Sequence, residues 1–172
     1  MPVKKLTLLA LFTTVSLALA AIENAFPPLV PLPGIKLGLA NIATLVLLLH
    51  FSPKETLAVL LSRVLLTTFF FGQAMSLLYS LAGGLLSLVV MAAAIKLFHR
   101  KYLFLTGALG GLFHNMGQLA AAFLVTSTPG ILGYFPFLAL GGILTGLFTG
   151  LCAGFAEKYL APFLPGPNSS GQ

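Results

Sequence analysis

Apolar segments follow one another along almost the whole chain, with only a few residues between them, and this succession severely limits the possible folds. About 20 apolar residues in a helix are enough to cross the hydrocarbon core of a bilayer. Only 7% of the 172 residues are charged, whereas a water-soluble domain carries about a quarter. The sequence therefore predicts an all-α integral membrane bundle of six transmembrane helices, at residues 6–26, 37–51, 55–71, 74–98, 103–125 and roughly 134–159.

Basic residues gather at the ends of the apolar segments, and their placement predicts an orientation. The net charge is +6, but these positions fit the positive-inside rule of membrane proteins better than nucleic-acid binding, and no nucleic-acid partner is expected. With a cytoplasmic N-terminus, six spans leave only Lys36 outside and Arg63 within a span. We therefore expect both termini to be cytoplasmic, together with Lys4, Lys5, Lys54, Lys96, Arg100, Lys101 and Lys158.

The first apolar segment has the features of either a cleaved signal peptide or a retained helix. Its basic start and the Ala-x-Ala at Ala18 and Ala20 suit cleavage. Its apolar run is long enough to span, and six spans with both ends on one side agree with the charge distribution. We therefore expect a retained helix, one transmembrane domain over residues 1–160, and a short polar tail with proline and glycine over residues 161–172.

Small residues recur every four positions on two of the predicted helices. In the last helix this pattern puts four glycines on one face, which predicts either tight packing inside the bundle or a dimer interface. Tight internal packing is the simpler reading. In the first helix the same rhythm predicts a groove for an internal neighbour or for a partner protein. The glycines are Gly142, Gly146, Gly150 and Gly154, and the groove residues are Ala10, Thr14 and Ala18.

Three polar side chains lie in the middle of the fifth apolar segment, in "GGLFHNMGQLAAAFLV". His114, Asn115 and Gln118 are three or four residues apart and share one broad helix face. They could join helices by hydrogen bonds, which contribute roughly 0.6 kcal/mol each in a membrane. The glycines near this cluster have no side chains and would let a ligand approach the helix backbone closely. The cluster favours a binding pocket, and helix joining stays open as the alternative.

Further polar residues are expected to converge on the same pocket. Arg63 lies in the middle of an apolar segment, where an ionisable residue needs a partner. It could pair with Glu23 or bind an anionic ligand. The loop after Glu23 has four prolines within seven residues, which predicts a stiff lid, and its flanks carry Lys36 and Asn41. Lys36 could contact the ligand or simply reach the membrane surface.

Two motifs carry a resemblance to a known family. "PGIKLGLAN" after a helix that contains glutamate, together with "FHNMGQ" in the fifth segment, resembles the family labelled both heptaprenyl diphosphate synthase component I and Gx transporter, over nearly the whole chain. That family looks related to the S components of energy-coupling-factor (ECF) transporters. The resemblance implies six helices in a bacterial-type cytoplasmic membrane, a vitamin-like solute bound near the outer side, and docking to a transmembrane coupling subunit with cytoplasmic ATPases. The matching docking residues would be Ala10, Thr14 and Ala18.

The residue content argues against several kinds of chemistry. Prenyl diphosphate synthases resemble one another in using aspartate-rich motifs to hold magnesium, but this chain has no aspartate. It also lacks a phosphate-binding loop, and three scattered histidines with one cysteine do not predict a metal site. We therefore expect no catalytic residues, cofactor or metal. The main hypothesis is a small-molecule-binding transport subunit, and the alternatives are a membrane companion of a soluble prenyl synthase subunit and a proton-coupled carrier.

Overall fold

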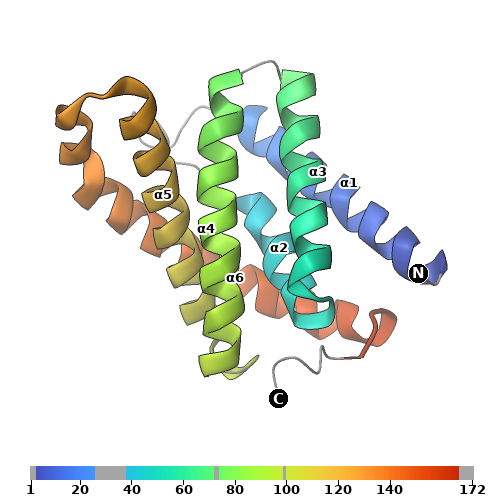
Figure 1. The fold of residues 1–172 in the computed structure, drawn as a ribbon. Coiled ribbons are helices and arrows are strands. Elements are labelled where there is room, and N and C mark those ends of the chain that lie inside the picture. The colour runs from blue at the N-terminus through green and yellow to red at the C-terminus, as the bar shows by residue number, and fades with distance from the viewer. Residues whose placement is uncertain (1–2, 26–37, 72–73, 99, 167–172) are drawn as a thin grey trace.

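The computed structural model describes residues 3–25, 38–71, 74–98 and 100–166. These residues form α-helices and a few short 3-10 turns, and the described part of the chain contains no strand. Figure 1 shows α4 at the front of the bundle between α3 and α5, with α6 crossing obliquely behind. The helices are α1 (Val3–Ala25), α2 (Leu39–His50), α3 (Pro53–Phe71), α4 (Ala74–Phe98), α5 (Leu103–Thr126) and α6 (Phe135–Leu160), and the 3-10 turns are η1 (Arg100–Tyr102), η2 (Pro129–Tyr134) and η3 (Ala161–Phe163).

Four segments of the described chain are long and apolar enough to cross a membrane, which indicates a membrane protein. The other two helices differ from the prediction of six spans for separate reasons. At about 1.5 Å per residue, the 12 residues of α2 cover roughly 18 Å, well short of the bilayer core. The α3 helix has 19 residues but carries Lys54, Glu55 and Arg63. The four candidate spans are Val3–Glu23, Leu77–Phe98, Arg100–Thr126 and Pro129–Phe163.

The short helix α2 forms the centre of the bundle. Ten of its 12 residues are buried, because α1, α3, α4 and α6 all contact it. Phe12 of α1 meets Phe51 at the end of α2 edge to face, with ring centroids 6.3 Å apart. A helix that is apolar on every side is expected to be buried in this way. The core around α2 also contains Leu9, Leu45, Val46, Leu47, Val59, Met91 and Ala153.

The start of α3 is fixed by a capping box. The Ser52 backbone N–H donates to Glu55 Oε2 at 3.0 Å, and the Glu55 N–H donates to Ser52 Oγ at 3.4 Å. Pro53 lies at the first helical position, where its missing N–H costs nothing. This turn reverses the chain tightly between α2 and α3.

The α5 helix packs against α4 on one side and α6 on the other. Glycines allow close backbone contact on both sides. On the α6 side, a Cβ added at Gly107 would meet the Gly146 carbonyl oxygen, and one at Gly111 would meet the Gly142 carbonyl oxygen. On the α4 side, a Cβ at Gly117 would lie 2.6 Å from the Ala82 carbonyl oxygen. The three helices therefore form a tightly packed layer, as helices joined through small residues in lipid do.

Candidate functional site

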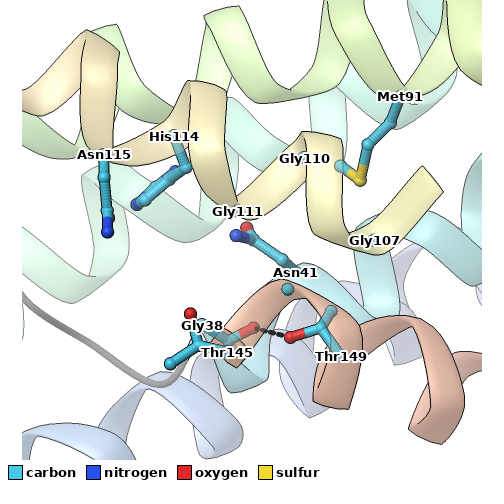
Figure 2. A pocket seen from close by; sticks show the side chains of 11 residues that line it. Gly38, Asn41, Met91, Gly107, Gly110, Gly111, His114, Asn115, Thr145 and Thr149 are labelled. Carbon is cyan, nitrogen blue, oxygen red and sulfur yellow. Dashed lines mark hydrogen bonds between the residues drawn. The ribbon is translucent and has the colours of Figure 1, made fainter. Parts of the chain in front are cut away.

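A small cavity bordered by several polar side chains lies where α2, α4, α5 and α6 meet (Figure 2). Its polar side chains come from three of these helices, and backbone from glycines makes much of the rest of the wall. Met91 of α4 closes one side against Gly110. The lining residues are Gly38, Asn41, Met91, Gly107, Gly110, Gly111, His114, Asn115, Thr145, Gly146 and Thr149.

The cavity depends on an unusual start of α2. Gly38 has φ 73°, in the left-handed region that glycine adopts without strain. Its N–H donates to Glu23 Oε1 at 2.6 Å, and its carbonyl oxygen accepts from the Asn41 N–H at 2.8 Å. Thr149 Oγ1 of α6 lies 3.5 Å from the same carbonyl oxygen. Glu23 therefore anchors the N-terminus of α2, where a carboxylate also interacts favourably with the helix dipole.

The polar face of α5 divides between two neighbouring helices. Asn115 is 3% exposed, and its Nδ2 donates to the Leu138 carbonyl oxygen of α6 at 2.8 Å. His114 lines the cavity, with its ring edge close to Gly83 of α4. Gln118 also faces Gly83, and its buried Oε1 has no hydrogen-bond partner among the residues that the structure describes. Asn115 thus joins α5 to α6 and also borders the cavity, as His114 does.

The other predicted site residues lie around the cavity or away from it. Asn41 lines the cavity directly, and Glu23 reaches it through Gly38. Arg63 is buried in α3 and interacts electrostatically with Glu23, but it does not line the cavity. Lys36 and the prolines of the expected lid lie outside the described residues.

The structure adds two hydroxyl groups that the sequence did not single out. Thr145 and Thr149 lie one turn apart on the face of α6 that carries the packed glycines. Threonine within an apolar helix normally bonds its own backbone, as Thr145 does to the Gly142 carbonyl oxygen at 3.4 Å. The sequence signal that could have identified them is their spacing of four residues, which is the same as that of Gly142 and Gly146.

The chemistry of the lining suits a neutral hydrogen-bonding group. Asn41, His114, Asn115, Thr145 and Thr149 offer donors and acceptors, and none of the carboxylates, lysines and arginines that the structure describes borders the cavity. Within the part of the chain that the structure describes, no three His, Cys, Asp or Glu side chains converge on a metal position. The cavity volume is about 10 Å³, which is room for about one water. A vitamin-sized ligand needs roughly 300 Å³ or more, so this conformation would have to open to admit one.

The residues expected to pack helices or to dock a partner differ in their surroundings. Gly142, Gly146 and Gly150 lie against the backbone of α5, whereas a Cβ at Gly154 would meet only Leu103 Cδ1, at 3.9 Å. On α1, the three residues expected to dock a partner are all exposed. These are Ala10, Thr14 and Ala18.

Replacing Asn115 by leucine is expected to destabilise the bundle modestly while leaving it folded. The substitution keeps the side-chain volume and removes the hydrogen bond to Leu138, a loss of about 0.6 to 1.7 kcal/mol in a membrane protein. Detergent-induced unfolding followed by circular dichroism would measure it. An Asn115→Leu protein as stable as the original would show that the bond adds nothing to the packing of α5 on α6.

One family model matches the chain. Its description is heptaprenyl diphosphate synthase component I, and the match covers residues 12–156, which include all six helices in whole or in large part. Comparison with curated proteins and with solved structures gives no match.

Proposed function

Since the chain belongs to the heptaprenyl diphosphate synthase component I family, we propose that it is a non-catalytic membrane companion of a separate, soluble prenyl diphosphate synthase subunit. The family match carries this proposal. The companion would hold the synthase at the cytoplasmic membrane, where a long isoprenoid chain partitions into lipid. Its four apolar candidate spans suit such an anchoring role.

The acidic residues support a role without catalysis. Magnesium on a diphosphate needs several oxygen ligands that converge. The chain has no aspartate, and each of its three glutamates is engaged elsewhere. Glu23 accepts from Gly38, Glu55 binds Lys5, and Glu157 binds His50 and Arg100. The diphosphate chemistry is therefore assigned to the partner subunit.

Recovery of the complex from its own host tests this function. The tagged chain would be extracted in mild detergent, and native mass spectrometry would record every bound protein and small molecule. We expect a soluble prenyl diphosphate synthase subunit to be recovered with it. Recovery of a membrane coupling subunit, ATPases and a retained metabolite, without a synthase, would contradict the proposal.

A second candidate function is a solute-binding subunit for uptake, of the ECF S-component type. The polar side chains around the cavity favour it, because intramembrane polar groups often mark solute sites. In that case Asn41, His114 and Asn115 of the cavity wall would contact the solute, and an opened cavity would have to bring Glu23, Lys36, Arg63 and Gln118 to it. The exposed small residues of α1 would dock the coupling subunit. A retained metabolite lost on His114→Leu, in a protein that still folds, would support this candidate.

A further inference from the structure

All six helices begin or end at one end of the bundle, at the bottom and lower right of Figure 1. Contacts between distant parts of the chain define this end. Lys5 Nζ of α1 meets Glu55 Oε1 of α3 at 2.5 Å, and His50 Nε2 of α2 meets Glu157 Oε2 of α6 at 2.6 Å. Leu103, the first residue of α5, packs on Gly150 of α6. The η1 turn after α4 joins this end through the Arg100–Glu157 ion pair.

Both carboxylates at this end are neutralised within the molecule. Glu55 is bound by the Lys5 ammonium and by the Ser52 N–H. Glu157 is bound by His50 on one oxygen and by Arg100 on the other, at 2.9 Å. Arg100 also donates to the Leu49 carbonyl oxygen. Neither carboxylate is left to balance a further cation.

Five exposed lysines remain around these ion pairs. None of them forms an ion pair with another residue of the described chain. Two are steadied by adjacent aromatic rings, with Lys101 Nζ 5.6 Å from the Tyr102 centroid and Lys158 Nζ 5.9 Å from the Tyr159 centroid. The five, which we call the lysine face, are Lys4, Lys54, Lys96, Lys101 and Lys158.

We propose that the lysine face docks an acidic surface of the soluble synthase subunit, an inference that rests on the function proposed above. A surface with one sign of charge and no available carboxylate selects a partner of the opposite sign and repels a second copy of itself. Orientation in the bilayer needs basic residues near helix ends. It does not require every carboxylate at that end to be sequestered, as Glu55 and Glu157 are.

The test weakens the lysine face without removing the charges that orient the chain. Lys96→Gln, Lys101→Gln and Lys158→Gln would be combined, which keeps Lys4, Lys5, Lys54 and Arg100 at the same end. The chain would be placed in nanodiscs of zwitterionic phosphatidylcholine, and binding of the soluble prenyl diphosphate synthase subunit from the same genome would be measured. We expect about tenfold weaker binding than the original chain, because each exposed ion pair contributes a fraction of a kcal/mol.

A charge-preserving variant is the matched control. Lys96→Arg, Lys101→Arg and Lys158→Arg together should keep most of the affinity, and high salt should weaken the original complex by screening. Unchanged binding by the glutamine variant would refute the role of the lysine face in docking while leaving the proposed function intact. Equal losses of affinity in the glutamine and arginine variants would refute that role as well. Binding that appears only with anionic lipid present would assign the lysines to lipid instead. No binding by the original chain in either lipid would refute the proposed function itself.

Discussion

Replacing Gly146 by alanine is expected to lower the free energy of unfolding by about 2 kcal/mol or more. A Cβ at this position would collide with the Gly107 carbonyl oxygen and lie 2.8 Å from Ala108 Cα. Both obstacles are backbone atoms, so no side chain can move aside to relieve the overlap. The α5 and α6 helices would have to separate, and every contact between their facing glycines would weaken at once.

A matched control lies two turns further along the same face of α6. The nearest atom to a Cβ at Gly154 is Leu103 Cδ1 at 3.9 Å, which is an ordinary contact. Gly154→Ala should therefore leave stability nearly unchanged. Because the chain has no tryptophan, detergent-induced unfolding is best followed by circular dichroism. Equal losses in the two variants would mean that glycine at these positions matters for backbone freedom and not for close packing.

The positions of the helices could be predicted well from the sequence. Apolar runs broken by proline, glycine and charged residues placed α4 at its observed bounds and the other helices within three residues of theirs. The four-residue glycine rhythm also pointed to a face of close approach, and Gly142, Gly146 and Gly150 lie on such a face in the structure. Local patterns sufficed here because each depends only on neighbours along the chain.

The placement of α2 in the bundle could not be predicted in the same way. Residues such as Leu45, Val46 and Leu47 have the same apolar character whether they face lipid or protein. Hydropathy therefore predicted the segment of α2 as a membrane span, although this helix has only 12 residues and is enclosed by four other helices. Only the three-dimensional packing separates a buried helix from a lipid-exposed one.

The candidate site was predicted in part. Helical spacing placed His114, Asn115 and Gln118 on one broad face, but α5 has neighbours on both sides of that face. Asn115 accordingly bonds to α6, whereas Gln118 packs against Gly83 of α4. Spacing along one helix gives the direction of a side chain and not the identity of the helix that it meets. The position of Thr149 in the cavity wall could not be predicted, because it depends on which helix lies against α5.

The largest electrostatic effect is expected from replacing Glu157 by glutamine. His50 is almost wholly enclosed, and its ring nitrogens face two acceptors, the Pro165 carbonyl oxygen at 2.7 Å and Glu157 Oε2 at 2.6 Å. Glu157 Oε1 also accepts a hydrogen bond from Arg100 Nη1 at 2.9 Å. Glutamine keeps the shape of residue 157 but replaces the charged carboxylate that both partners contact with a neutral amide. Losing the charged partner of a buried hydrogen bond costs about 2 kcal/mol.

Glu55→Gln is the appropriate control, because it removes a carboxylate from the same end of the bundle. Its partner Lys5 is 33% exposed at the start of α1 and can turn into water, so we expect a loss of less than about 1 kcal/mol. Adding His50→Gln to Glu157→Gln should cost less than the sum of the two single changes, since the two side chains are in contact. The same unfolding assay would measure all three proteins. If Glu157→Gln costs no more than Glu55→Gln, the contacts of Glu157 contribute no more to stability than the exposed Lys5–Glu55 pair.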